Sequence, residues 1–255
     1  MALRDLVVMI AGQTGWGYTR VLGELRKLTR RPVSRQFVVN VMREHGFDPG
    51  PKRGEKTWDE FLMIHAQTLW QCDFFSKKVL TLSGVREFFV LAFILVGTRR
   101  VYVTPATANP TEEWCRARAV DFVRHTACVG LKAEFVFHDR DRKFGKAFDQ
   151  ELARHGIKSN RVAYRAPNLN AFIERWVQSI EVECLDHFIV FGERHLNYLV
   201  AEYVRHFLTE RPHQSLGNAP LDELPAPPDD VPATADVRCE RSLGGLLKHY
   251  HRAAA

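Results

Sequence analysis

Residues 69–97 read LWQCDFFSKKVLTLSGVREFFVLAFILVG, two apolar runs separated by the short break LSGV. Apolar runs that are rich in Val, Leu and Phe and meet at such a break predict strands over 69–81 and 86–97, joined as a hairpin. The following RRVYVTPAT alternates at Val101 and Val103 and predicts a third strand. The sequence therefore predicts three successive antiparallel strands.

Downstream of these strands, short apolar runs alternate with amphipathic segments. Helices are predicted over 111–126, 143–155, 169–186 and about 193–208. The segments EFVFHD and IKSNRVA between them predict two short strands. Strands first and then alternating helices and strands indicate an α/β fold with a mixed sheet covered by helices.

The composition is that of a folded protein. With 255 residues, of which 45% are hydrophobic and 26% charged, the chain has room for one large domain and a smaller one. No apolar stretch of about 18 residues is free of charge, and the N-terminus lacks a cleavage-site pattern, so neither a membrane span nor a signal peptide is expected. The five cysteines show no metal-binding spacing, and we expect them to be reduced in a cytoplasmic protein.

The net charge of +6 is confined to the N-terminal segment. Residues 1–58 contain 11 Lys and Arg against 5 Asp and Glu, and the remaining residues contain 25 of each. Two helices are predicted here, from Gly17 to Leu28 and from Ser34, a plausible N-cap, to a stop at Gly46. A local excess of this kind favours a polyanionic partner.

The second of these helices presents polar side chains suited to the major groove of DNA, where Gln and Asn can pair with adenine and Arg with guanine or phosphate. They lie opposite the apolar stripe and are Arg35, Gln36, Asn40 and Arg43. The alternative is a basic helix that merely solvates a surface. The confinement of the charge to this segment favours DNA.

Composition also places the domain boundaries. The Pro-, Gly- and Lys-rich residues 48–57 predict a linker between a helix-turn-helix-like segment, 1–47, and a larger core, 58–218. The Pro-rich start of residues 219–255 predicts an extended C-terminal tail over a surface.

Three acids interrupt or end the apolar segments of the core. Asp73 lies within the first strand, Asp139 ends the EFVFH strand, and Glu174 lies one turn into the long helix. Three converging carboxylates would bind magnesium and could support phosphoryl transfer. Singly, each acid also has a structural interpretation: pairing of Asp73 with Lys77 or Lys78, a turn or cap at Asp139, or a favourable helix-dipole position for Glu174.

The motifs around these acids resemble those of the DDE integrase and transposase superfamily. The nearest resemblance is to the integrase-core transposases of bacterial insertion sequences, which are related to retroviral integrases. The resembling segments are WQCDFF, FVFHDRDRKF and RAPNLNAFIERWVQSIEVECLDHF, followed by HFLTERPHQSLGN. They occur in the family's order, and the resemblance covers roughly residues 15–218.

This resemblance implies a ribonuclease H-like five-stranded mixed sheet flanked by helices, with Asp73, Asp139 and Glu174 as the catalytic triad and metal ligands. It implies Mg²⁺ or Mn²⁺ as the cofactor, and cutting and joining of DNA ends without a covalent protein intermediate. The implied partners are mobile-element ends and target DNA, bound by a homo-oligomer, with no membrane and with a location at the bacterial nucleoid.

Residues near the triad gain expected roles from the same resemblance. The candidates for contact with phosphate or DNA are His138, Arg140, Lys143, Asn168 and Arg175. For Asn168, helix capping is an alternative. Asp141 lies beyond the matched acid and is not expected to be a ligand. His213 and Gln214 match a family landmark to which we assign no catalytic role.

The chain departs from the family pattern in ways that keep other functions open. Asp139 and Glu174 have 34 intervening residues, one fewer than is commonest, and Gln178 and Glu181 stand where relatives often place bases that grip DNA. A catalytically inactive DNA-binding remnant or regulator is therefore one alternative. A ribonuclease H-like nuclease is another, although it predicts a fourth core acid and no basic helical segment. The short N-terminus leads us to expect a fragment or a second reading frame of a longer element.

Overall fold

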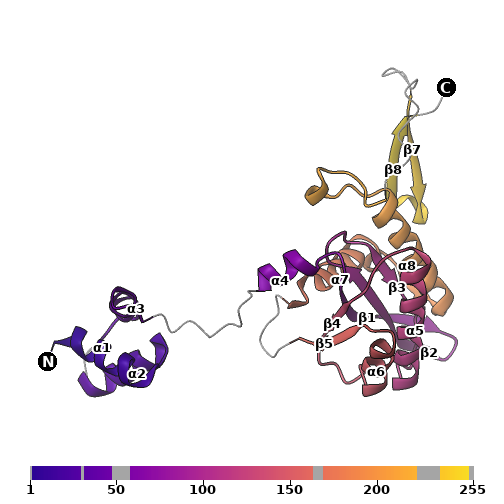
Figure 1. The fold of residues 1–255 in the computed structure, drawn as a ribbon. Coiled ribbons are helices and arrows are strands. Elements are labelled where there is room, and N and C mark those ends of the chain that lie inside the picture. Colours follow the sequence, from indigo (N-terminus) through magenta and orange to yellow (C-terminus); the bar gives the residue numbers. More distant parts are fainter. Residues whose placement is uncertain (1, 30–31, 48–57, 163–168, 223–235, 253–255) are drawn as a thin grey trace. The chain divides into compact units, whose positions relative to one another are not determined.

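The computed structural model describes residues 2–29, 32–47, 58–162, 169–222 and 236–252 (Figure 1). The chain divides into two compact units, residues 1–61 and residues 62–255. We call them the helical unit and the mixed-sheet unit. The linker predicted over 48–57 lies outside the described residues.

The helical unit contains α1 (Leu3–Thr14), α2 (Tyr18–Thr29), α3 (Arg35–Glu44) and the start of α4 (Trp58–His65). The prediction of a helix pair was incomplete because α1 also contributes to the core. Val7, Ile10 and Ala11 of α1 pack in one apolar cluster with residues of α2 and α3. Two short helices alone bury little apolar surface, and the third helix enlarges the shared core.

The start and end of α3 agree with the sequence signals. The Ser34 side chain accepts a hydrogen bond from the Phe37 backbone N–H at 3.2 Å, which confirms the predicted N-cap. Gly46 follows the helix with φ +73°, a left-handed conformation that glycine adopts at low cost.

The mixed-sheet unit is built on five main strands in the order β3-β2-β1-β4-β5, with a short β6 beside β1. Their bounds are Leu69–Thr81 for β1, Gly84–Leu95 for β2, Val101–Val103 for β3, Phe135–His138 for β4, Lys158–Arg161 for β5 and Val190–Phe191 for β6. β1 pairs antiparallel with β2 and β2 with β3, whereas β4 runs parallel to both β1 and β5. The predicted mixed five-stranded sheet is confirmed.

Helices cover both faces of this sheet (Figure 1). They are α5 (Glu112–Cys128), α6 (Lys146–Arg154), α7 (Ala171–Glu183) and α8 (Gly192–Thr209). Because side chains alternate along a strand, β1 contributes to two separate cores. Trp70 and Cys72 pack with residues of α5 and α6, whereas Phe75 and Val79 pack with residues of α7 and α8. This layered arrangement confirms the ribonuclease H-like fold class.

The sequence predicts an extended tail over 219–255, but residues 237–252 of this segment form strands. β7 (Val237–Ser242) and β8 (Leu247–Arg252) pair as an antiparallel hairpin. Leu243 and Leu247 anchor this hairpin in the core beside α7 and α8. The Pro-rich residues 223–235 before it lie outside the described part of the chain.

Short 3-10 turns complete the described elements, at Leu185–His187, Gln214–Leu216 and Leu243–Gly245. All five cysteines are free, and Cys72, Cys115 and Cys184 are buried. In the described part of the chain, no helix has both the length and the apolar character needed to span a membrane.

Candidate active site

Asp73 and Asp139 occupy equivalent positions on two neighbouring parallel strands. Cys72 of β1 lies in register with His138 of β4, and each acid is the next residue of its chain segment. Adjacent parallel strands in register direct equivalent side chains to the same side of the sheet. Since Phe75 packs against α7, the two acids leave the sheet on the side that α7 and α8 cover.

A buried glutamine connects this side of β1 to the helix that carries Glu174. Gln71 is fully buried, and its Oε1 accepts the backbone N–H groups of Phe172 at 3.0 Å and Ile173 at 3.1 Å. Its Nε2 donates to the backbone carbonyl of Leu169 at 2.9 Å. These bonds hold the first turn of α7, and with it Glu174, against the strand that carries Asp73. Sequence reasoning missed Gln71, although an uncharged polar residue inside the buried run LWQCDFF was an available signal.

The pKa of Asp73 depends on its burial and on the charges of the neighbouring acids. Burial and, after it, the charge of Asp139 raise the pKa of Asp73 to about 7, with smaller contributions from Glu174 and Asp141. The Phe74 backbone N–H, 2.8 Å from Oδ1, opposes the shift. The alternative that Asp73 pairs with Lys77 is not realised, because Lys77 binds Asp186 at 2.9 Å.

These residues suit a hard divalent cation, although the side chains do not form a ready-made metal centre. Within the described ranges, no three His, Cys, Asp or Glu side chains are gathered so that they could ligate an ion. Carboxylate oxygens are nevertheless the ligands that Mg²⁺ and Mn²⁺ prefer. A cation would also remove the repulsion that raises the pKa of Asp73. The assignment of Asp73, Asp139 and Glu174 as metal ligands stays a prediction. The three carboxylates are a donor set that fits Mg²⁺ or Mn²⁺.

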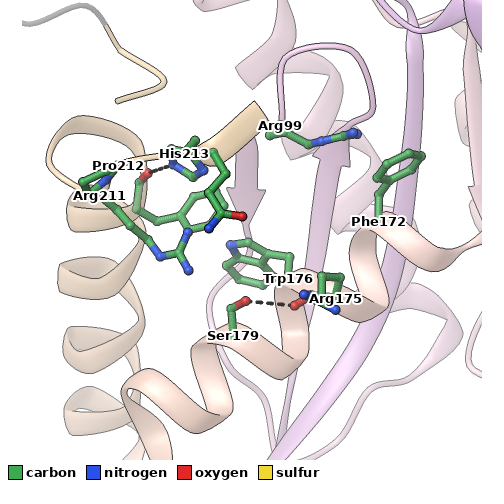
Figure 2. Close-up of a pocket in the computed structure, with 10 residues that line it drawn as sticks. Arg99, Phe172, Arg175, Trp176, Ser179, Arg211, Pro212 and His213 are labelled. Atoms are coloured by element: carbon green, nitrogen blue, oxygen red, sulfur yellow. Dashed lines mark hydrogen bonds between the residues drawn. The ribbon is translucent and has the colours of Figure 1, made fainter. Parts of the chain in front are cut away.

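Glu174 and Arg175 are exposed on the first turns of α7. Arg175 lines a pocket of about 470 Å³ that the C-terminal end of α8 and the β2–β3 connection complete (Figure 2). Arg175 therefore remains available for contact with DNA. Asn168 lies outside the described residues, so its predicted role is not addressed.

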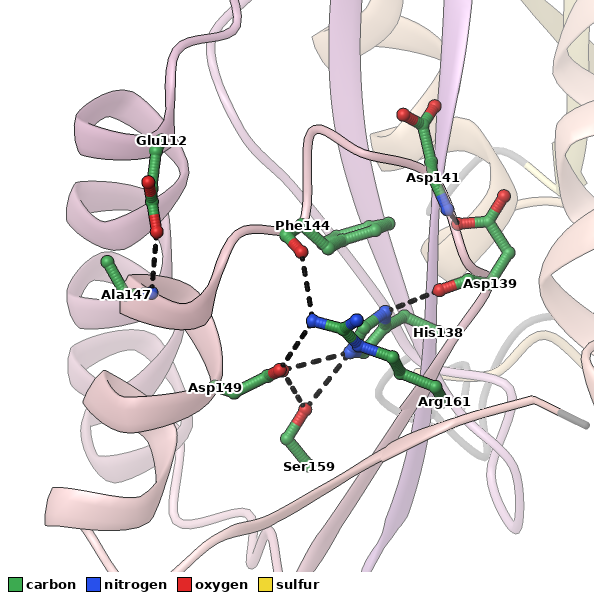
Figure 3. Close-up of polar contacts among 9 residues, drawn as sticks. All are labelled: Glu112, His138, Asp139, Asp141, Phe144, Ala147, Asp149, Ser159 and Arg161. Carbon is green, nitrogen blue, oxygen red and sulfur yellow. Dashed lines mark hydrogen bonds and ion pairs between the residues drawn. The ribbon is translucent and has the colours of Figure 1, made fainter.

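The resemblance implied that His138 could meet phosphates. This expectation is wrong, because the His138 side chain is fully buried on the opposite side of the sheet (Figure 3). Its Nδ1 donates to the Asp139 carbonyl oxygen at 2.7 Å. Its Nε2 lies 3.0 Å from Asp149 Oδ1 and 3.1 Å from Ser159 Oγ. The backbone of Asp139 is thereby tied through His138 to α6 and β5.

Asp149 is the centre of this network (Figure 3). It accepts hydrogen bonds from Ser159 at 2.6 Å and from Arg161 at 3.1 Å, in addition to its contact with His138. Desolvation raises the pKa of Asp149, but the hydrogen bonds from His138 and Ser159 outweigh it, and the net shift is downward. The network therefore holds an ionised carboxylate behind the strand that presents Asp139.

The two remaining candidates, Arg140 and Lys143, lie in the segment HDRDRK after β4. The Asp141 backbone N–H donates to Asp139 Oδ1 at 3.0 Å, and the Asp141 side chain binds Lys143 Nζ at 2.6 Å. Lys143 Nζ lies 5.4 Å from the centre of the Phe74 ring, on the other side of β1 from Asp73. The structure does not bring Lys143 to the acids. Arg140 is exposed, and its Nε donates to the Val162 carbonyl at 3.2 Å.

In the helical unit, the four residues predicted to read DNA are all exposed on α3. They are Arg35, Gln36, Asn40 and Arg43. Gln36 Nε2 donates to Asn40 Oδ1 at 2.8 Å, so the two amides are arranged side by side. The opposite face of α3 carries the buried Val38, Val41 and Met42. These four polar side chains are therefore accessible to a partner.

Comparisons with known proteins bear on the mixed-sheet unit. Residues 155–220 match the family model described as an integrase core domain. This segment contains Glu174, α8 and the RPHQSLG motif. A search of curated proteins found no match.

Similar solved structures include retroviral integrases. The HTLV-2 integrase catalytic core domain in complex with magnesium, in its trimeric form, is 13% identical with a TM-score of 0.45, over 60% of this chain and 93% of that chain. A simian T-cell lymphotropic virus intasome in complex with PP2A regulatory subunit B56 gamma is 12% identical with a TM-score of 0.49, over 96% and 86% respectively. The catalytic core domain of BIV integrase is 12% identical with a TM-score of 0.42, over 61% and 91%.

The family-model match begins after β4, so it covers Glu174 and leaves out Asp73 and Asp139. The assignment of those two acids rests on the sequence motifs and on the register of β1 and β4. The likeness to an integrase core domain is thus shown for residues 155–220.

Proposed function

We propose that this chain is a transposase that catalyses metal-dependent DNA strand cleavage and strand transfer at the ends of a mobile element. The observation that carries the proposal is the placement of Asp73 and Asp139 at equivalent positions of neighbouring parallel strands. Burial raises the pKa of Asp73, and the charge of the neighbouring Asp139 adds to this effect, so that the pKa is about 7. A pair of acids with this mutual repulsion is typical of a functional site.

In this proposal Asp73, Asp139 and Glu174 hold Mg²⁺ or Mn²⁺. The bound metal supplies Lewis-acid activation of a water or a 3′-hydroxyl and stabilises the leaving oxygen. Gln71 keeps Glu174 close to β1, and His138 holds the backbone of Asp139. The remaining role of the protein is to position the DNA.

The helical unit would supply recognition of the element ends. The exposed amides of Gln36 and Asn40 are suited to base edges, and Arg35 and Arg43 to phosphates or guanine. Two element ends must be joined to one target, which favours a homo-oligomer on DNA. Such a protein would act at the nucleoid of a bacterial cell.

A strand-transfer assay with Mg²⁺ and oligonucleotides from the flanking element ends tests this function. We expect joined products with the intact protein, and a loss of roughly a thousandfold or more for Glu174→Gln and for Asp139→Asn. Glu193→Gln is the matched control, because Glu193 is also an exposed acid in the first turn of a helix. Its activity should stay within about twofold of the intact protein.

A second candidate function is a DNA-binding remnant or regulator without catalysis. Gln178 and Glu181 favour it, because they stand where relatives often place bases that grip DNA. No strand transfer by the intact protein, together with retention of the DNA on a gel in EDTA, would support this alternative and contradict the first.

A further inference from the structure

The pocket beside α7 is a second site that the acids do not use. One wall is a single stripe of α7, formed by Phe172, Arg175, Trp176 and Ser179, and Glu174 does not line it (Figure 2). Arg99 of the β2–β3 connection and the segment 211–214 after α8 form the other walls. A volume of about 470 Å³ is in the range of small-ligand sites.

The pocket is positively charged because its arginines are only partly neutralised. None of the described residues that line it is Asp or Glu. Glu183 pairs with Arg211 at 2.6 Å, which offsets one charge. The Arg99 guanidinium lies 3.7 Å above the Phe172 ring and donates to the Val96 carbonyl, and Arg175 has no ion pair among the described residues. Among the described residues, Arg99 and Arg175 therefore have no anionic partner.

A buried donor points to the same conclusion independently of the charge. Trp176 is 2% exposed, and its indole N–H finds no hydrogen-bond partner in the described part of the chain. In Figure 2 the indole nitrogen lies on the side of the ring that is drawn toward Arg211 and His213. Buried N–H groups are almost always bonded, so an acceptor from a ligand is the expected partner.

Two uncompensated guanidinium groups and one orphaned N–H donor together select an oxyanion with several acceptor oxygens. We infer that this pocket binds a backbone phosphate of a DNA strand, with Arg99, Arg175 and the Trp176 indole as its donors. The inference rests on the proposed function for its choice of DNA as the source of the phosphate. Because Arg175 follows Glu174 directly, the strand held here would present a neighbouring phosphodiester to the acids.

Nuclear magnetic resonance of the indole N–H groups tests this site in the full-length protein. The chain has five tryptophans, so Trp176→Phe identifies the Trp176 signal by its disappearance. A single-stranded hexathymidylate is titrated in EDTA, where strand transfer cannot occur. We expect the Trp176 signal to shift, and inorganic phosphate to produce the same shift only at much higher concentration.

Affinity measurements with the same oligonucleotide separate a binding role from a structural one. Trp176→Phe keeps an aromatic ring and removes the donor together with the five-membered part of the indole. Arg175→Gln changes an exposed side chain and keeps the binding test independent of the packing of Trp176. Each should weaken binding about tenfold, because each removes a hydrogen bond to a charged group. Arg124→Gln is the matched control on α5, where Arg124 is 77% exposed, and its effect should stay below about twofold.

Three results would overturn the inference. They are an unmoved Trp176 signal, equal weakening by Arg175→Gln and Arg124→Gln, and binding of free phosphate or of an acidic peptide as tightly as the oligonucleotide. Failure of strand transfer leaves these readouts unaffected, because they require no catalysis. The pocket and the proposed function can thus fail separately.

Discussion

In the helical unit, the side chains predicted to contact DNA share one exposed face of a single helix, whereas in the mixed-sheet unit the acids come from two strands and a helix. Arg35 and Arg43 lie eight positions apart on α3, about two helical turns. Asp73 and Glu174 are brought together only by the packing of α7 on β1. The first kind of site depends on local structure, and the second depends on the whole fold.

The difference extends to electrostatics. The polar residues of α3 are solvated, so their charges can act on a partner at long range and are screened by salt. The carboxyl of Asp73 is largely desolvated, and its pKa is raised by that burial and by its acidic neighbours. A recognition surface can therefore tolerate loss of one residue more easily than a site in which each carboxylate depends on the others.

The largest expected effect tests whether the two units are independent. Leu25→Ala removes a fully buried side chain from the helical core and should destabilise that unit by about 3 kcal/mol. Hydrogen exchange measured by mass spectrometry should show lost protection in residues 2–47 and unchanged protection in the mixed sheet. Leu28→Ala, at a position that is 57% exposed on the same helix, should change little. Equal loss of protection in the sheet would show that the units are coupled.

Removing two bases from α3 should weaken DNA binding without affecting the fold. Arg35→Ala combined with Arg43→Ala should reduce affinity for element ends about a hundredfold and lower the salt slope by about 2. Gel-shift titrations at several salt concentrations measure both quantities. The control removes Arg20 and Lys27, two bases of α2 in the same unit. If both double variants lose affinity equally, α3 is not the recognition helix.

Gln71→Ala should both destabilise the mixed-sheet unit and reduce strand transfer. The change leaves backbone groups of Leu169, Phe172 and Ile173 without their buried partner and should cost about 2 kcal/mol in the free energy of unfolding. Strand transfer should fall further than DNA binding, because the first turn of α7 is released. Ser76→Ala serves as the control, because Ser76 also lies on β1 and its hydroxyl makes only an exposed contact with Glu87 of β2. Unchanged transfer by Gln71→Ala would contradict its positioning role.

The smallest effect concerns an ion pair behind the arginine pocket. Desolvation raises the pKa of Glu183, but hydrogen bonds from Arg211 and Tyr203 outweigh it and lower the pKa below 4.5. Stabilisation from an acid with a depressed pKa is present above its unfolded pKa and is lost as the pH falls through the folded value. Glu183→Gln should therefore cost about 1 kcal/mol at pH 7, and almost nothing near pH 3.

Urea unfolding of both proteins between pH 3 and 7 measures this difference. Glu24→Gln removes an exposed pair with Lys27 on α2 and should change stability by less than about 0.5 kcal/mol at every pH. A constant difference between Glu183→Gln and the intact protein across this pH range would show that ionisation of Glu183 is not the cause.

Much of the fold could be predicted from local patterns in the sequence. The first strand was predicted over 69–81 and is observed as Leu69–Thr81, because one long apolar run with a clear break needs no tertiary information. The Ser34 cap and the long helix after Leu169 were found for the same reason. α1 and the hairpin over 237–252 were missed, and the structure shows that each of them completes an apolar core.

By itself, the sequence determined the order of strands and helices, the confinement of positive charge to the N-terminus and the three acidic motifs, all of which are properties of short segments. Only the tertiary structure decided what these segments meet. Gln71 reaches Ile173 across 102 positions of the chain, His138 is buried behind Asp139, and Arg99, Arg175 and Trp176 enclose one pocket. Strand register and helix packing bring such residues together, and both arise from long-range contacts that no local pattern encodes.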